Sequence, residues 1–100
     1  MDTLDGMRTV IAVVETGSFT AASERLGMSK ALASKYVGEV ENALGVRLFN
    51  RSTRRLALTE AGRRYYERAL PLLEEFSELE DDVTGEQSNP QGLLRVSMPV

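Results

Sequence analysis

Residues 18–45 read SFTAASERLGMSKALASKYVGEVENALG, and this stretch decides the fold. It holds two helix patterns on either side of a glycine turn. Ser18 can cap the first helix and Gly27 can end it, while Ser29 can cap the second. Two helices joined by a tight turn that contains glycine form a helix-turn-helix pattern. The sequence therefore predicts a helix-turn-helix at about residues 19–38.

One apolar side runs along each of these helices and along a further helix that precedes them. Apolar residues recur at steps of three and four, which is the spacing of an amphipathic helix. The expected inward residues are Phe19, Ala22 and Leu26 in the first helix of the motif, Ala33, Val37, Val40 and Leu44 in the second, and Leu4, Met7, Ile11 and Val14 in a preceding helix over residues 3–15.

The apolar period changes after the second helix of the motif. Residues 47–50 and 55–58 are two short strand candidates, and the polar turn 51–54 separates them. Two short strands around a polar turn predict a β-hairpin. A hairpin placed after a helix-turn-helix is a wing.

A long helix is predicted after the hairpin, with Thr59 as its cap and its end at Val83 or Thr84. Its apolar residues alternate steps of four and three, which is the a/d seam of a coiled coil. Such a seam on a helix that extends past a small domain predicts a dimer; the alternative is that the helix folds back on its own domain. Pro71 removes one backbone hydrogen bond, but the seam continues in register on both sides of it. The candidate dimerisation residues are Tyr65, Ala69, Leu72, Phe76, Leu79 and Val83.

The chain divides into four segments on this basis. Residues 1–59 form the expected winged helix-turn-helix, and residues 60–84 form the dimerisation helix. Residues 85–92 are a hinge by composition. Residues 93–100 are a strand-like run with nothing to pair with, which predicts the start of a truncated effector-binding domain. The predicted fold class is mainly α: three helices and a short β-hairpin wing, followed by a long dimerisation helix.

The charge distribution indicates a polyanionic partner, although the net charge of the chain is −3. Residues 25–68 carry ten Lys and Arg against four Glu, a net charge of +6. Residues 1–24 carry a net charge of −3 and residues 69–100 a net charge of −6. A cation-rich segment between acidic ends predicts one surface suited to a phosphate backbone, since concentrated positive charge attracts nucleic acid.

Several function classes are disfavoured by what the sequence lacks. It has no cysteine and no histidine, which removes the commonest metal ligands and the commonest general base. It has no apolar run near the roughly 20 residues that span a bilayer, and its start lacks a signal-peptide pattern. We therefore expect a cytoplasmic binding protein with no metal, cofactor, catalytic residue or membrane partner.

The second helix of the motif carries the candidate recognition face. The side opposite its apolar residues holds Lys30, Ala31, Ser34, Lys35 and Gly38. Small residues allow close approach to base edges, and lysine and serine donate hydrogen bonds to bases or phosphates. The alternative is a plain solvated helix face. Glycine inside a helix costs about 1 kcal/mol relative to alanine, so Gly38 needs a reason, either a close contact with DNA or packing against a helix.

Arginines in the hairpin form a second candidate surface for DNA. Arg51, Arg54 and Arg55 lie within five residues at the predicted turn, whereas lone surface arginines usually only aid solubility. Three together predict a wing that grips the phosphate backbone or enters the minor groove. Thr20 and Ser29 stand at helix starts, where hydroxyl and backbone N–H groups suit phosphate; for Ser29 the alternative is capping alone.

Two arginines at the start of the long helix leave two roles open. Arg63 and Arg64 either touch flanking phosphate or pair with Glu60 and Glu67 at helical spacing. The function of the basic face is open in the same way: it binds DNA, or it docks on an acidic protein. An enzyme is the most distant class, because no nucleophile–base pair and no metal set is found.

Four motifs in order resemble the LysR-type family of bacterial transcriptional regulators. Residues 14–22, VETGSFTAA, resemble its first helix-to-helix junction, and residues 26–29, LGMS, resemble its turn. Residues 44–51, LGVRLFNR, and residues 58–62, LTEAG, resemble the helix exit, the wing and the start of the linker helix. The match covers about residues 4–84, and the ordered set is far more specific than any one motif.

The resemblance implies a sequence-specific regulator that binds an interrupted palindrome of double-stranded DNA as a homodimer. It leaves a tetramer open as a further oligomeric state of the full-length protein. It also implies a C-terminal domain, beyond this chain, that binds a small-molecule inducer. Carried over by position, the family's DNA-contacting residues fall on Lys30, Ala31, Ser34 and Lys35, with wing contacts at Arg51 and at Arg54 or Arg55.

The motif departs from the family pattern at several positions: the family often has proline or serine at the position of Ala31, and it has alanine followed by a larger aliphatic residue where this chain has Leu32 and then Ala33. The family usually has glutamine at the position of Lys30 and arginine at the position of Lys35. Lysine in place of an amide shifts the expected contact from adenine toward guanine or phosphate. Lysine in place of arginine gives up bidentate geometry, so a different base preference is expected at Lys35.

Overall fold

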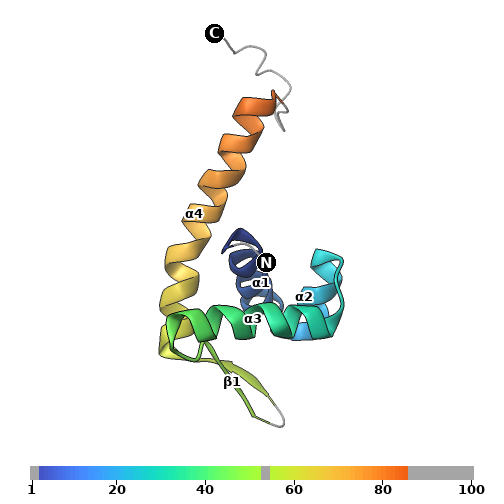
Figure 1. Ribbon diagram of the computed structural model, residues 1–100, viewed down its shortest axis with the longest axis vertical. Helices are drawn as coiled ribbons and strands as arrows, with labels where there is room; N and C mark the ends of the chain where they lie inside the picture. The colour runs from blue at the N-terminus through green and yellow to red at the C-terminus, as the bar shows by residue number, and fades with distance from the viewer. Residues whose placement is uncertain (1–2, 53–54, 86–100) are drawn as a thin grey trace.

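A long helix rises from a small helical domain in the computed structural model, which describes residues 3–52 and 55–85 (Figure 1). The mainly α fold, with a hairpin after the third helix and a long final helix, is confirmed. The elements are, in order, α1 (Thr3–Thr16), α2 (Phe19–Leu26), α3 (Lys30–Leu44), β1 (Phe49–Arg51), β2 (Leu56–Leu58) and α4 (Glu60–Thr84).

The predicted ends of the helices are confirmed by their hydrogen bonds. Ser18, Ser29 and Thr59 each accept a hydrogen bond from the backbone N–H three residues later, at 3.0, 3.0 and 2.9 Å. Gly27 and Gly45 end α2 and α3 in the left-handed conformation, with φ of 70° and 73°. These caps define the helices because they satisfy backbone groups that a helix end leaves without partners.

The core lies where α1 meets the helix-turn-helix and the start of the hairpin. Its main cluster consists of Val10, Ala12, Val13, Ala22, Val37, Val40, Leu48 and Phe49. A second, smaller cluster joins α1 to α4 through Met7, Ile11 and Ala69. α1 thus lies between α2 and α4 and packs against both (Figure 1).

Leu44 differs from the expectation that it faces the core. It is 53% exposed, whereas Ala33, Val37 and Val40 are buried as predicted. Leu44 is the last residue of α3, and it lines an open groove between α1, α3 and α4. Helical spacing predicts which side a residue faces, but not where along the helix the neighbouring elements stop covering it.

The hairpin is shorter than the predicted strands 47–50 and 55–58. β1 begins two residues later than predicted and β2 one residue later, with Phe49 opposite Leu58 in an antiparallel pair. The backbone of Leu48 is used elsewhere: its N–H donates to a buried carboxylate of α3 at 2.8 Å, and its carbonyl accepts from the residue that caps α4 at 3.0 Å. Leu48 therefore anchors the hairpin and does not join the ladder.

The two halves of α4 have different surroundings, and only the first half packs on the domain as the fold-back alternative expected. Ala69 is only 5% exposed, because α1 covers it. Beyond Pro71, which the helix passes without ending, Leu72 is 58% exposed and Val83 is 74% exposed. The first half of α4 therefore folds back on the domain, and the second half projects away from it (Figure 1).

The expected hinge, residues 85–92, and the expected strand, residues 93–100, lie outside the described residues except for Gly85. Gly85 ends α4 with φ of 77°. The division of the chain between residues 1–59 and 60–84 stays a prediction, although the first half of α4 packs on α1.

Candidate nucleic-acid interface

One face of α3 brings the predicted recognition residues together. Lys30, Ala31 and Lys35 are exposed and Ser34 is half-buried, on the side of α3 away from the core. The hydroxyl of Ser29 caps the helix immediately before them. The result is a narrow surface of small, hydroxyl and cationic side chains at the N-terminal end of α3, which suits base edges and phosphates.

The two lysines of this face have different neighbours. Lys35 lies 4.0 Å from Glu39, one helical turn later, and its side chain is 66% exposed. An exposed pair of this kind is weak, so Lys35 can exchange it for a phosphate or a base. Lys30 forms no ion pair within the described part of the chain. Both cations are therefore available to a partner.

Thr20 lies apart from this face, in the first turn of α2. It is exposed, and its carbonyl accepts a hydrogen bond from the Ser23 hydroxyl at 2.7 Å. Ser18 caps α2, so the Thr20 hydroxyl has no capping role. The predicted phosphate contact of Thr20 stays a prediction, at a helix start that would suit it.

Gly38 sits half-buried in the middle of α3, with open space where a side chain would point. A Cβ added there would meet no atom within 4 Å. At Gly62 in α4, by contrast, a Cβ would collide with the backbone of Leu48 and the side chain of Leu58. Packing therefore explains the glycine in α4 but not the glycine in α3. A close contact of Gly38 with DNA stays a prediction.

The three predicted wing arginines do not lie alike. Arg51 is held by the protein: its guanidinium donates to Glu41 at 3.2 Å and lies 5.2 Å from the centre of the Phe19 ring. Arg55 is exposed and forms no ion pair among the described residues. Arg54 lies outside the described residues. Of the two wing arginines that the structure describes, Arg51 is therefore bound to the protein and Arg55 faces solvent.

Glu41 is a residue that the sequence reasoning missed. It is only 5% exposed, and its carboxylate accepts hydrogen bonds from the backbone N–H groups of Leu48 and Phe49 at 2.8 and 3.2 Å. Its other oxygen lies 3.2 Å from Arg51 and 3.6 Å from Arg47. A signal was present, because Glu41 falls on the apolar side of α3, and a buried acid needs partners.

Of the two arginines at the start of α4, Arg63 pairs with neighbouring carboxylates and Arg64 does not, within the part of the chain that the structure describes. Arg63 bonds to Glu60, and to Glu67 at 3.0 Å. These carboxylates raise the pKa of Arg63, with Glu60 as the main cause. Arg64 is exposed and forms no ion pair in the described ranges. Pairing therefore accounts for Arg63, whereas a partner for Arg64 stays open.

Glu15 ties three helices together beside the motif. Its carboxylate accepts hydrogen bonds from Arg25 of α2 at 2.7 Å and from the Tyr66 hydroxyl of α4 at 3.0 Å. The bond from Arg25 is the main cause that lowers the pKa of Glu15, and the bond to Glu15 raises the pKa of Tyr66. This network holds the first helix of the motif against α1 and α4.

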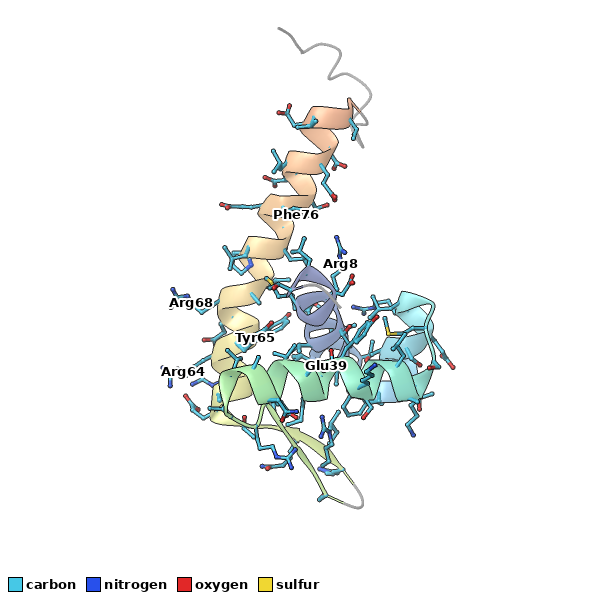
Figure 2. All side chains as sticks on the ribbon, in the orientation of Figure 1. Arg8, Glu39, Arg64, Tyr65, Arg68 and Phe76 are labelled. Carbon is cyan, nitrogen blue, oxygen red and sulfur yellow. The ribbon has the colours of Figure 1, made fainter. Side chains whose placement is uncertain are left out.

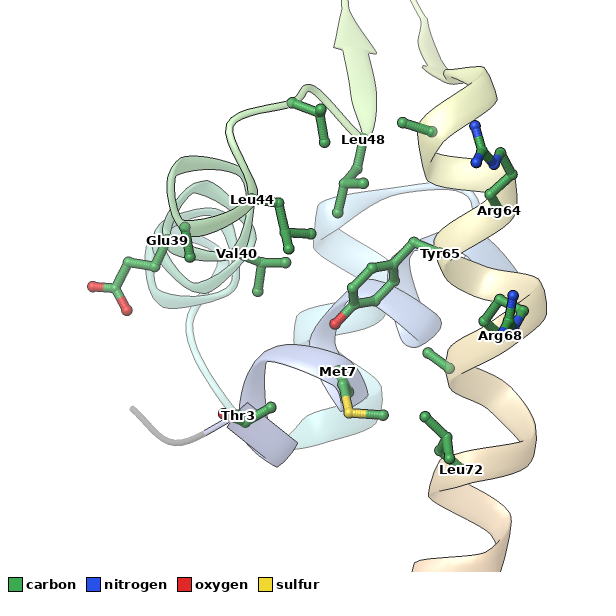
Figure 3. Close-up of a pocket in the computed structure, with 14 residues that line it drawn as sticks. Thr3, Met7, Glu39, Val40, Leu44, Leu48, Arg64, Tyr65, Arg68 and Leu72 are labelled. Atoms are coloured by element: carbon green, nitrogen blue, oxygen red, sulfur yellow. The ribbon is translucent and has the colours of Figure 1, made fainter.

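An open groove lies between α1, the end of α3 and the first half of α4 (Figure 3). Its volume is about 750 Å³ and its lining is mainly apolar. Arg64 and Arg68 stand on the α4 side of the groove and Glu39 on the α3 side (Figure 3). The apolar lining includes Met7, Val40, Leu44, Leu48, Tyr65 and Leu72.

The second half of α4 carries an apolar stripe among acidic side chains, and Phe76, labelled in Figure 2, belongs to this stripe. In the stripe, Phe76 is half-buried, whereas Leu72, Leu79 and Val83 are each more than half exposed. The surrounding acids, all exposed, are Glu74, Glu75, Glu78, Glu80, Asp81 and Asp82. The first half carries the exposed cations Arg63, Arg64 and Arg68. α4 thus has a basic half bound to the domain and an acidic half that projects.

Two other kinds of site were absent from residues 3–52 and 55–85. No helix in these ranges is long and apolar enough to cross a membrane. No group of three or more acidic side chains in these ranges is placed to hold a metal ion.

A helix-turn-helix with an exposed second helix, a wing behind it and a long final helix defines a winged helix-turn-helix domain with a linker helix. The family model described as bacterial regulatory helix-turn-helix protein, lysR family, matches residues 4–63. The chain therefore belongs to the LysR family, and the resemblance seen in its motifs is confirmed.

Relatives with assigned roles are regulators of transcription. The chain is 46% identical over 96 residues to the HTH-type transcriptional repressor PA14_22550 of Pseudomonas aeruginosa, a match that covers 96% of this chain and 30% of that protein. It is 41% identical over 90 residues to the HTH-type transcriptional activator TtdR of Escherichia coli, covering 90% of this chain and 29% of that protein. The chain thus spans about 30% of the length of these relatives.

Solved structures of similar shape include two DNA complexes. The BenM_DBD/catB site 1 DNA complex matches with a TM-score of 0.78 and 29% identity, covering 89% of this chain and 99% of that one. The CbnR_DBD–DNA complex matches with a TM-score of 0.76 and 33% identity, covering 85% of this chain and 97% of that one. The fold described here is therefore that of DNA-binding domains in this family.

Proposed function

We propose that this chain is the DNA-binding part of a transcriptional regulator and reads double-stranded DNA with α3 in the major groove. The observation that carries the proposal is the exposed α3 face, where Lys30 and Lys35 flank the small side chains of Ala31 and Ser34, near the open Gly38. Small residues let a helix approach base edges, and lysines donate to bases and phosphates. The similarity to the BenM and CbnR domains in DNA complexes supports the same class of partner.

Phosphate contacts supplement the reading face in this proposal. Arg55 is exposed on the wing, and Arg54, which precedes it in the sequence, is proposed to contribute in the same way. Thr20 and Ser29 stand at the N-terminal ends of α2 and α3, where backbone N–H groups attract anions. These contacts would position the domain on the duplex and leave the sequence to be read by α3.

The proposed working form is a homodimer joined through α4. Of the six predicted dimer residues, Ala69 is covered by α1 and Tyr65 is half-buried against the same helix. The other four form the bare stripe of the projecting half. A row of exposed apolar side chains marks an interaction surface. A dimer would place two copies of α3 on the two half-sites of an interrupted palindrome, which multiplies affinity and specificity.

The charges of α4 favour an antiparallel pair of helices. In a parallel pair the acidic second halves would lie side by side and repel. In an antiparallel pair, the acidic half of one copy lies along the first half of the other, beside Arg64 and Arg68. This orientation also brings Leu79 and Val83 of one copy toward the apolar groove of the other. The groove is therefore the proposed seat of the second copy's helix.

The remainder of the regulator is proposed to follow this chain and to bind a small-molecule inducer. The relatives extend far beyond the matched segment, which leaves room for such a domain. A repressor and an activator are both among these relatives. The protein would act on DNA in the cytoplasm as a regulator and not as an enzyme, with a tetramer as a further state of the full-length form.

Selection of bound duplexes from a random pool tests this function. The expected result is an interrupted palindrome whose affinity falls steeply with salt, because lysines and arginines displace counterions from DNA. Lys35→Ala should lower the affinity roughly 5- to 100-fold and relax the preference at one base pair of each half-site. Arg8→Ala is the matched control, since Arg8 points away from the wing (Figure 2). A pool with no enriched sequence and no salt dependence would overturn the proposal.

A further inference from the structure

We propose that Arg51 positions the wing from within the protein and does not itself grip DNA, an inference that rests on the proposed DNA-binding function. Arg51, in β1, contacts one side chain from each helix of the motif: Phe19 of α2 and Glu41 of α3. Its guanidinium donates to Glu41 at 3.2 Å and lies 5.2 Å from the centre of the Phe19 ring. Its side chain is 33% exposed.

The carboxylate of Glu41 holds Arg51 because that carboxylate is buried. One oxygen, Oε2, accepts the backbone N–H groups of Leu48 and Phe49 at 2.8 and 3.2 Å. The other, Oε1, accepts from Arg51. If Arg51 turned out toward a phosphate, Oε1 would keep, among the described residues, only Arg47, at 3.6 Å and with a side chain that is 68% exposed. Leaving a buried charge without its close partner is costly, so the arginine stays with the protein.

Phe19 fixes the other side of the guanidinium. The ring packs against the main core and meets the ring of Phe49 edge to face, with centroids 6.2 Å apart. A cation over an aromatic face is attracted to it, and a flat guanidinium fits a ring and a carboxylate at once. Arg51 therefore links β1 to both helices of the motif. This link sets the angle at which the hairpin leaves α3, and phosphate contacts are left to the exposed Arg55.

The direction in which Glu41→Gln changes DNA affinity distinguishes an Arg51 that positions the wing from an Arg51 that contacts phosphate. The probe is the duplex that the unmodified protein selects from a random pool, with affinities measured over roughly 50 to 200 mM salt. For a positioning arginine, Glu41→Gln should lower affinity roughly tenfold and remove the wing's hydroxyl-radical footprint while the footprint of α3 remains. For an arginine that grips phosphate, removal of the competing carboxylate should leave affinity equal or higher. That second result would overturn the inference.

A double-mutant cycle measures the link between Glu41 and Arg51 directly. The double variant Glu41→Gln with Arg51→Gln should lose no more affinity than either single variant, because each change breaks the same link. Additive losses would overturn the inference. Arg47→Gln is the matched control: Arg47 also faces Glu41, but it lies farther away, at 3.6 Å, and its own side chain is 68% exposed, so the change should alter affinity less than about twofold.

Circular dichroism melting separates loss of wing position from loss of fold. If Glu41→Gln does not fold, Arg51→Gln alone decides: positioning predicts loss of the whole wing footprint, whereas a direct contact predicts an intact footprint and a salt slope lower by about one. Arg55→Gln should show that second pattern. An unmodified protein that selects no duplex overturns the proposed function itself. A protein that binds DNA, and whose Glu41→Gln variant keeps its affinity, overturns only the role of Arg51.

Discussion

The two halves of α4 share one apolar spacing but meet different surroundings. In the first half, Ala69 is 5% exposed under α1, whereas in the second half Val83 is 74% exposed. α1 has 14 residues and α4 has 25, so α1 cannot cover the whole of α4. A heptad period therefore predicts which side of a helix is apolar, but the length of the neighbouring element decides whether that side becomes core or interface.

Gly62→Ala should cause the largest loss of stability, because Gly62 lies in the half of α4 that packs on the domain. The new Cβ would collide with the carbonyl of Leu48, and backbone cannot move aside as a side chain can. Leu48 is also held by its bonds to Glu41 and Thr59. We expect the free energy of unfolding to fall by about 3 kcal/mol, measured by urea denaturation.

Gly38→Ala is the matched control for that change, since it places the same methyl group inside a helix. A Cβ at Gly38 meets nothing within 4 Å. The free energy of unfolding should therefore rise by about 1 kcal/mol, the helix-propensity difference between alanine and glycine. If both variants lost the same stability, packing at Gly62 would not be the reason for its glycine.

Leu79→Glu tests the projecting half of α4. Leu79 is 55% exposed, so the variant should remain folded, but a charge in the stripe disfavours its burial against a second copy. We expect light scattering to report a monomer where the unmodified protein is a dimer. Affinity for a duplex with two half-sites should fall at least about tenfold, and affinity for a single half-site should not change.

Ser77→Glu is the control for charge in that half. Ser77 is exposed two residues before Leu79, which places it on another side of α4, off the stripe. It adds the same charge and should leave the mass and the affinity unchanged. Loss of the fold in Leu79→Glu, or an equal effect of both variants, would mean that the stripe is not the dimer surface.

The DNA affinity of Gly38→Ala sharpens the contrast between the two glycines. The variant is expected to be more stable than the unmodified protein and yet to bind DNA roughly fivefold more weakly, a change of about 1 kcal/mol. The reason is that the methyl group would stand where the partner approaches α3. Fluorescence anisotropy with the selected duplex measures it. Unchanged affinity would assign Gly38 no role in the interface.

Local signals predicted most of the fold. The three caps Ser18, Ser29 and Thr59 were read from residue type and spacing, and each makes the expected hydrogen bond. The recognition residues follow from the same period, because residues opposite Val37 on one helix must face outward. Helix limits and helix faces depend on neighbours within one or two turns, so they can be predicted from a single sequence.

Contacts between distant parts of the chain account for what could not be predicted. The outward position of Leu44 depends on where α1 and α4 end around it. The inward turn of Arg51 depends on Glu41, ten residues earlier, and on Phe19 in another helix. The bond between Glu15 and Tyr66 joins residues 51 positions apart. Charge counting assigns such side chains to the surface, since it has no information on their partners.

Glu15→Gln should cause the smallest loss of stability, because the hydrogen bonds that Glu15 accepts lie at the surface of the domain. The pair with Arg25 is partly exposed, so the loss at pH 7 should be only about 0.5 kcal/mol of unfolding free energy. Arg25 lowers the pKa of Glu15 in the folded protein, so the stabilisation is present above the ordinary carboxyl pKa and is lost as pH falls through the lowered value. The difference between variant and unmodified protein should therefore vanish once the pH has fallen below the lowered pKa of Glu15. Glu24→Gln, an exposed change on α2, is the control, and a difference that persists in acid would show that the Glu15 charge is not its source.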